Sequence, residues 1–295
     1  MWDQSVLVRP PAVAGYFYPA DPKELVELIE WSFKHELGPG KIPEVGSIGE
    51  RRSIAFMVPH AGYIYSGPIA AWSYYYLGLE GAPETVVLIG PNHTGLGPTI
   101  SVMPPSIWET PLGGVKTDDE VVTLLPEVCP IVEQDSTAHA YEHSLEVQLP
   151  FLQYLFNDSF RIVPIVMKVM TPSTSKLLAD CIMDLMKKLK RDYVILASSD
   201  LNHYEPHDIT VKKDMIALER IVNLDVEGLY KVLIEYDISM CGPGPVMTAM
   251  TVDKALGAKR AILLKHATSG DTSGDKSSVV GYASVRFPLP GFEEV

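Results

Sequence analysis

Residues 54–63 have the sequence Ile-Ala-Phe-Met-Val-Pro-His-Ala-Gly-Tyr, an apolar run that stops at a proline. A run of this length with such an ending predicts a buried strand that leads into a tight turn. Pro59 disfavours helical backbone at Val58, so we expect His60 at the carboxyl end of the strand. In open α/β sheets, ligands bind beside the carboxyl ends of the strands. His60 is therefore the first candidate functional residue.

The same arrangement recurs twice further along the chain. The apolar run 85–89 ends in Gly-Pro-Asn and delivers His93, and the run 193–197 opens into a turn that carries Asp200 and His203. Neighbouring strands lie about 4.8 Å apart, so loops that leave one edge of a sheet bring such side chains within about 10 Å of each other. The repeat predicts a common cleft that contains His60, His93, Asp200 and His203.

Strands and helices alternate along the chain, which predicts a three-layer α/β/α sandwich around a mostly parallel, mixed central sheet. An antiparallel hairpin of 261–264 and 278–287 is expected to close the sheet. We expect a single domain over residues 1–295, although the helices near 205–257 could form a subdomain. The segment 108–114 is expected to be rich in turns, and Pro150 to kink or break its helix. Helices are expected to begin at residue 22, to span about 68–77, 118–125, 142–156, 172–189, 210–222 and 226–235, and to run from the turn at 239–245 to residue 256.

Composition restricts the partners and the compartment. The formal net charge of −13 argues against nucleic acid as a partner. No run approaches the roughly 18 apolar residues of a membrane span, and the N-terminal residues lack the apolar core of a signal peptide. Three widely spaced cysteines suit a reducing compartment better than a disulfide framework. We therefore expect a soluble cytoplasmic protein. The scarcity of Gln and Asn also suggests a thermophilic source.

Cys241 differs from the other two cysteines. It lies in a Gly/Pro turn directly before a predicted helix, where the helix dipole favours a thiolate. Cys129 and Cys181 are expected to be small core residues. Imidazoles, a carboxylate and a thiolate in one cleft suit a transition metal.

Two further patterns bear on cofactors. His139 and His143 have the i, i+4 spacing of a helical metal pair but lack the Glu of the zinc-protease helix. The glycine-rich fingerprint of dinucleotide sites, the phosphate-binding P-loop and the serine-hydrolase elbow are absent from the sequence. We therefore expect no nucleotide cofactor.

Taken together, these residues make the chain resemble the Memo family, named for a mediator of cell motility in animals. The resemblance runs nearly end to end, and several short motifs carry it: Ala14-Gly15-Tyr16-Phe17-Tyr18, Pro59-His60-Ala61-Gly62-Tyr63, Gly90-Pro91-Asn92-His93, Glu142-His143-Ser144, Ser198-Ser199-Asp200 with His203, and Cys241-Gly242.

That family is similar to the class III extradiol ring-cleaving dioxygenases, which bind non-haem Fe(II) through two histidines and a carboxylate. The resemblance implies that His60 and His93 are metal ligands and that Cys241 takes the third position. It also implies that His203 is the acid/base, with Asp200 beside it. By the same resemblance, Glu142 and His143 would line the cavity.

A cysteine in place of the carboxylate leaves iron or copper as the expected metals, with zinc as a third candidate. One interpretation is a metal-dependent oxidoreductase that acts on oxygen or a phenolic small molecule, with Tyr16, Phe17 and Tyr63 as an apolar wall. The alternative is a non-catalytic module that binds a peptide or an anionic small molecule in the same cleft, since animal relatives have been linked to phosphotyrosine peptides. A homo-oligomer fits either interpretation.

Overall fold

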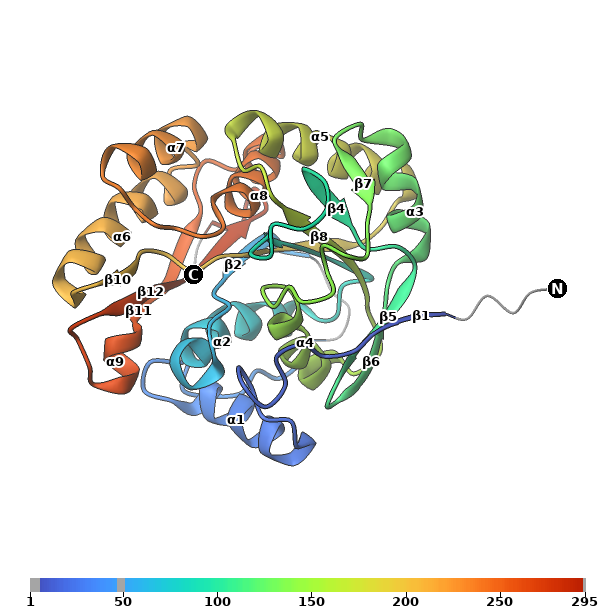
Figure 1. The fold of residues 1–295 in the computed structure, drawn as a ribbon. Coiled ribbons are helices and arrows are strands. Elements are labelled where there is room, and N and C mark those ends of the chain that lie inside the picture. Colours follow the sequence, from blue (N-terminus) through green and yellow to red (C-terminus); the bar gives the residue numbers. More distant parts are fainter. Residues whose placement is uncertain (1–5, 47–50, 294–295) are drawn as a thin grey trace.

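The central sheet is mixed, with parallel strands in the middle and antiparallel pairings on either side of them (Figure 1). The computed structural model describes residues 6–46 and 51–293. The four parallel strands in the middle of the sheet are almost entirely buried, as parallel strands covered on both faces must be. The parallel centre consists, in spatial order, of β2 (Ser53–Val58), β9 (Tyr193–Ser198), β3 (Thr85–Pro91) and β8 (Arg161–Met167).

Antiparallel strands extend this centre on both sides. On one side β12 (Val279–Pro288) pairs with β2 and also holds β10 (His203–Glu205) and β11 (Ile262–Thr268). On the other side β4 (Ile100–Val102) pairs with β8 and carries β7 (Val132–Gln134). A separate small sheet contains β1 (Leu7–Arg9), β5 (Ser106–Thr110) and β6 (Gly113–Lys116).

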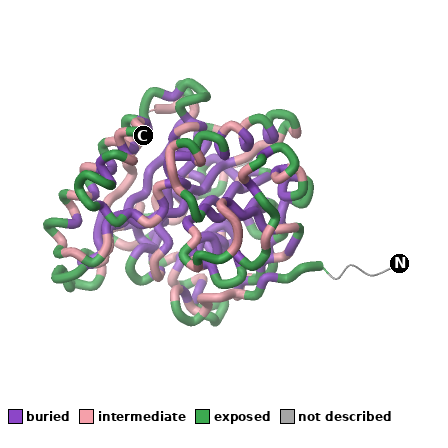
Figure 2. Tube along the Cα trace, turned by 45° about the horizontal axis from the view of Figure 1, so that its top comes forward, coloured by how far each residue is buried: buried purple, intermediate pink, exposed green. Residues whose placement is uncertain are grey.

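Helices cover both faces of the central sheet and enclose two large apolar cores among the described residues. The first core lies under α1 (Pro22–Lys34), α2 (Tyr63–Glu80) and α4 (Leu149–Phe156). Figure 2 shows buried residues concentrated in the middle of the molecule and exposed ones along the outer helices. The second core lies under α3 (Asp119–Val128), α5 (Pro172–Leu189), α6 (His207–Val222), α7 (Val226–Glu235) and α8 (Pro243–Ala255). Helices therefore lie on both faces of the sheet, and the three-layer α/β/α prediction is confirmed.

Several expected elements are confirmed and others differ for local reasons. The last long strands, β11 and β12, form the expected antiparallel hairpin, and the short helix α9 (Ser269–Ser273) lies in the loop between them. Helix α2 begins five residues before Pro68, because the N–H groups of Tyr65 and Ser66 both donate to the carbonyl of Gly62. The turn-rich excursion at 108–114 is a β-hairpin of β5 and β6, in which Gly113 has a φ of +118°.

The helix expected over 142–156 is shorter than predicted. It consists of the 3₁₀ turn Glu146–Gln148 followed by α4. Glu142 holds the preceding segment in an irregular path, because its carboxylate accepts the backbone N–H groups of His93 and Ser144. Pro150 lies in the first turn of α4, where its missing N–H needs no partner, so it starts the helix rather than kinking it.

The expectation that the chain has no disulfide is wrong. Cys129, at the end of α3, and Cys181, within α5, form a disulfide with a Cα–Cα distance of 5.6 Å. Both are core residues, as expected, but α3 and α5 pack together and bring the two sulfurs into bonding range. Among the described residues, none of the helices combines the length and the apolar character needed to cross a bilayer.

Candidate metal centre and its cavity

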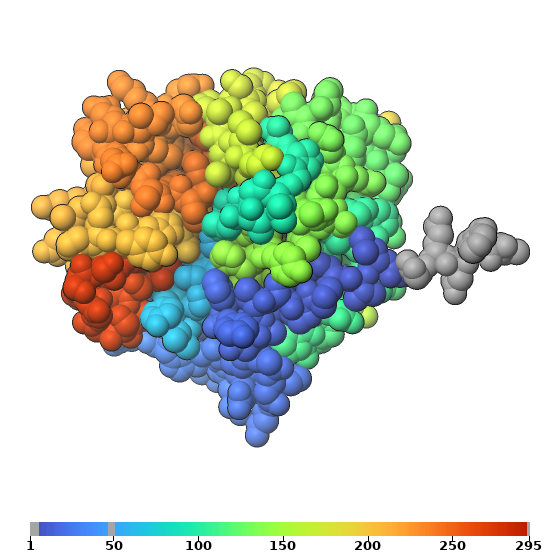
Figure 3. Space-filling view, in the orientation of Figure 1, coloured from blue at the N-terminus to red at the C-terminus, as the bar shows by residue number. Residues whose placement is uncertain are grey.

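A cavity of about 600 Å³ opens at the carboxyl edge of the parallel strands. Loops from both halves of the chain adjoin on this face of the molecule (Figure 3). His60 and Asp200 follow β2 and β9, His93 follows β3, and Cys241 precedes α8. The predicted common cleft is therefore present, since the neighbouring strands β2, β9 and β3 bring His60, Asp200 and His93 to one place. The lining consists of Phe17, His60, Ala61, Gly62, His93, His143, Asp200, His203, Tyr204, Ser239, Cys241 and Val280.

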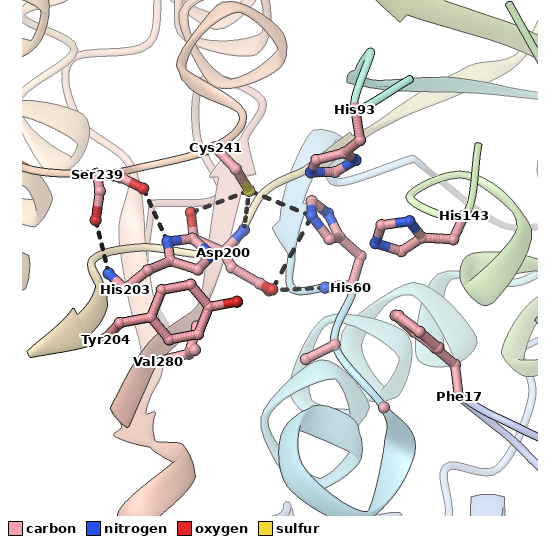
Figure 4. A pocket seen from close by; sticks show the side chains of 12 residues that line it. Phe17, His60, His93, His143, Asp200, His203, Tyr204, Ser239, Cys241 and Val280 are labelled. Carbon is pink, nitrogen blue, oxygen red and sulfur yellow. Dashed lines mark hydrogen bonds and ion pairs between the residues drawn. The ribbon is translucent and has the colours of Figure 1, made fainter. Parts of the chain in front are cut away.

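Three imidazoles converge in this cavity (Figure 4). One ring nitrogen from each of His60, His93 and His143 lies within 4.8 Å of the other two. The rings of His93 and His143 stack at a centroid distance of 4.6 Å, and His60 meets both edge-on. Among residues 6–46 and 51–293 this trio is the group whose geometry suits a metal ion. Cys241, which we expected as the third ligand, is not part of this trio, whereas His143 is.

A hydrogen-bond network fixes the tautomer of His60. The hydroxyl of Ser198 donates to the carbonyl of Ser144, so its oxygen accepts from Gln148 Nε2 and from His60 Nδ1, which is 2.8 Å away. The proton of the neutral imidazole is therefore on Nδ1, and Nε2 presents a lone pair to the cavity. This is the protonation state that a metal ligand requires.

Glu142 orients the second imidazole from behind the cavity. Its buried carboxylate accepts His93 Nδ1–H at 2.9 Å and the backbone N–H of His93 at 2.6 Å. Burial alone would raise the pKa of Glu142, but the hydrogen bond and charge of His93 lower it to about 2. Burial likewise opposes the charged form of His93, yet Glu142 raises the pKa of that imidazole above its usual value. A carboxylate–histidine pair of this kind is a common support for metal ligands.

The other two imidazoles are neutral at physiological pH. Burial, reinforced by the neighbouring His93, lowers the pKa of His60 to about 3. Burial, reinforced by His60, lowers the pKa of His143 to about 4. Each ring can therefore offer a lone pair without first releasing a proton.

Cys241 lies beside the trio rather than within it. Its Sγ is 3.2 Å from His60 Nε2 and accepts the backbone N–H of Asp200 at 3.3 Å. Burial, together with the charge of Asp200, raises the pKa of the thiol well above its ordinary value. The expectation of a thiolate at this helix start is wrong for the protein without a metal, because burial outweighs the helix dipole. Two acceptors face the thiol proton, His60 Nε2 and the carbonyl of Asp200, which lies 3.7 Å from Sγ.

Asp200 and His203 flank the other side of the cavity. Asp200 accepts the backbone N–H of His60 at 2.8 Å, and its second oxygen is 4.0 Å from His60 Nε2. Burial raises the pKa of this carboxyl. His203 Nδ1 lies 2.8 Å from the carbonyl of Ser239, which must accept its proton, so Nε2 is left as a proton acceptor.

The remaining predicted cleft residues separate into different positions. Phe17 lines the cavity, 4.7 Å from the ring of His143. Tyr16 is not among the lining residues and is 88% exposed, and Tyr63 is buried with its hydroxyl donating to the carbonyl of Val147. Glu142 lies behind the imidazoles rather than on the wall.

Other residues of the site were not expected from the sequence. Ser198, Tyr204, Ser239 and Val280 all contribute, and of these Ser198 could have been found because it directly follows the apolar run 193–197. His139, which has the i, i+4 spacing to His143, is buried beside Trp108 and does not belong to the histidine trio.

The fold and the site define a class of protein: a three-layer α/β/α sandwich with a histidine-lined cavity at the carboxyl edge of its sheet. Comparison with known proteins supports the family resemblance that the sequence motifs indicated. The family described as Memo-like protein matches residues 9–286, and the chain belongs to this family. A MEMO1 family protein of Ignicoccus hospitalis is 74% identical over 285 residues, covering 97% of this chain and 100% of the relative. Another, from Sulfolobus acidocaldarius, is 55% identical over 283 residues, covering 95% and 99%.

Proposed function

We propose that this protein binds one transition-metal ion through His60, His93 and His143, with Cys241 as a fourth donor. The convergence of three ring nitrogens within 4.8 Å carries the proposal. It changes the ligand set inferred from the sequence, in which His60, His93 and Cys241 formed the complete set.

The surrounding hydrogen bonds support this assignment. His60 and His93 each have Nδ1 occupied, by Ser198 and Glu142, which leaves Nε2 of each ring as the ligand atom. Because Glu142 favours the protonated form of His93, a metal ion would displace a proton from that nitrogen. Donors that share an ion at about 2.0–2.3 Å lie about 3.5 Å from one another. Cys241 Sγ, 3.2 Å from His60 Nε2, already has nearly this separation. Its high pKa is no obstacle, since a bound metal deprotonates a coordinating thiol.

Imidazole and thiol donors favour iron or copper, with zinc as the third candidate. When bound, such an ion would supply Lewis acidity and, for iron or copper, redox chemistry. We propose an oxidoreductase of the extradiol-dioxygenase type that acts on a small phenolic molecule. Phe17 and Val280 would provide apolar contact, and His203 Nε2 would accept a proton from the ligand, with Asp200 next to it.

Elemental analysis of protein that is purified anaerobically and under reducing conditions tests the proposal. Anaerobic handling matters because oxidation of Cys241 would destroy one donor. We expect stoichiometric iron or copper in the wild type, much less in His143→Ala and Cys241→Ala, and no change in His35→Ala. Metal-free wild-type protein that binds a phosphopeptide would instead support the non-catalytic alternative.

The heat adaptation suggested by the scarce amides gains support from the Cys129–Cys181 disulfide. Intracellular disulfides are well documented in hyperthermophilic archaea and bacteria. The cytoplasmic location and a homo-oligomer stay predictions.

A further inference from the structure

Tyr204 has a backbone conformation that its residue type rarely adopts. In the short pairing of β10 with β12, His203 is opposite Val280 and Glu205 is opposite Val279, so Tyr204 is an extra residue in a β-bulge. Its φ is +61°, in the left-handed region. That region costs energy for residues other than Gly, Asn and Asp, and most of all for bulky ones.

The other described residues with this feature have a simple explanation. Tyr204 is the one within a strand, because the remaining non-glycine residues with positive φ follow the last residues of helices: Asn157, Lys190, Leu224 and Asp237. At all four positions the residue's own N–H bonds to a carbonyl of the preceding helix, and positive φ at helix ends is common. No such role exists at Tyr204, and backbone strain of this kind concentrates at ligand sites.

The surrounding backbone maintains the bulge. The N–H of His203 donates to Ser239 Oγ at 2.8 Å, the N–H of Leu201 donates to the carbonyl of Gly281 at 2.8 Å, and the N–H of Gly281 donates to the carbonyl of Asn202 at 2.9 Å. Bulges change the direction of one side chain, and here the bulge places the ring of Tyr204 in the cavity wall.

The ring is well placed but has little protein contact. It is 77% exposed, and its centroid is 5.5 Å from the ring of His203. In Figure 4 the ring lies across the cavity, and its hydroxyl is directed towards the side that carries Asp200 and His60. Within the described residues the hydroxyl makes no hydrogen bond. A strained backbone thus holds the ring at the cavity with its hydroxyl open to solvent, where both can contact a molecule in the cavity.

We propose that Tyr204 is the ligand-contact residue of this cavity. Its ring covers one side of a planar, oxygen-bearing small molecule, and its hydroxyl donates a hydrogen bond to an oxygen of that molecule. The inference rests on the proposed function, because the ligand is placed at the ion held by the three imidazoles.

The test uses the Zn(II)-loaded full-length protein, since zinc has no redox chemistry and binding can be measured without turnover. The probe is 4-nitrocatechol, titrated by absorbance. The variants are Tyr204→Phe, Tyr204→Ala and Tyr204→Gly, and the controls are the same changes at Tyr16, which is exposed outside the cavity. Zinc content and thermal unfolding are measured for every variant.

We expect full zinc content in all variants. Loss of the hydroxyl in Tyr204→Phe should weaken probe binding about fivefold, and loss of the ring in the other two should weaken it at least about tenfold. Tyr204→Gly should unfold at least about 2 °C above Tyr204→Ala, because glycine adopts a φ of +61° without strain. The Tyr16 variants should bind the probe like the wild type.

Three results would overturn the inference. Probe binding within twofold of the wild type in Tyr204→Ala would refute the contact, and a wild type that binds zinc but no probe would refute the ligand class. Equal stability of Tyr204→Gly and Tyr204→Ala would refute the strain argument. Zinc-free wild-type protein would contradict the proposed function itself, which is a distinguishable failure.

Discussion

Replacement of Glu142 by Gln should weaken both the fold and the metal site. The carboxylate accepts the backbone N–H and Nδ1–H of His93 and the N–H of Ser144, whereas a glutamine of the same shape presents one acceptor oxygen and an NH₂ group. One N–H donor would then face another donor inside the protein. Gln in this position also lacks the charge that stabilises protonated His93.

The magnitude follows from the pKa of the carboxyl. It falls from the ordinary 4.5 to about 2 in the folded protein, which corresponds to about 3 kcal/mol at about 1.4 kcal/mol per pH unit. Because the folded-state pKa is the lower one, the folded protein binds fewer protons than the unfolded chain between these values. The stabilisation is therefore complete above about pH 4.5 and is lost as the pH falls towards 2.

The assay is urea unfolding of the metal-free protein at pH 7, 4.5 and 3, with Glu133→Gln on the exposed part of β7 as the control. We expect Glu142→Gln to lose about 3 kcal/mol at pH 7 and progressively less in acid, and to bind metal about 10–100-fold more weakly. Equal unfolding of Glu142→Gln and wild type at pH 7 would refute the reasoning, as would a difference that does not shrink in acid.

Three further predictions concern the fold. Asp253 is buried without a hydrogen-bond partner, and burial raises its pKa from 3.8 to about 8. The free energy of unfolding of the wild type should thus fall as the pH rises from about 4 to 8. In chemical unfolding, Asp253→Asn should remove this loss, with a gain of up to about 6 kcal/mol above pH 8 and little gain below pH 4. Loss of the disulfide in Cys129→Ala/Cys181→Ala should cost up to about 4 kcal/mol, given the sequence separation of 52; unfolding midpoints unchanged by the double substitution would contradict this. Gly281→Ala should cost about 1–3 kcal/mol, because the added Cβ would lie 1.9 Å from Asp214 Oδ2, and a Tm equal to that of the wild type would show that the contact can relax.

The elements that could be predicted have local signals. Helices α5 and α7 have the predicted bounds, since Pro172 begins the first and an apolar period marks both. The strand ends that carry His60 and His93 were predictable because an apolar run followed by a proline or a Gly-Pro pair encodes both the strand and its turn. The sheet then brings the two histidines together without further information.

The features that could not be predicted depend on contacts between distant residues. His143 joins the trio because Glu142 shapes an irregular segment by binding to the loop after β3. Cys129 meets Cys181 only when α3 packs on α5. The bulge at Tyr204 requires β12, which lies 75 or more residues further along the chain. Local sequence patterns do not contain this information.

The most direct test of the central claim is an anomalous-scattering crystal structure of freshly reduced, metal-loaded protein. The account predicts a single peak within about 2.0–2.2 Å of one ring nitrogen from each of His60, His93 and His143, with Cys241 Sγ at about 2.3 Å. A peak that contacts fewer than three of these imidazoles, or that lies outside the cavity, would contradict it.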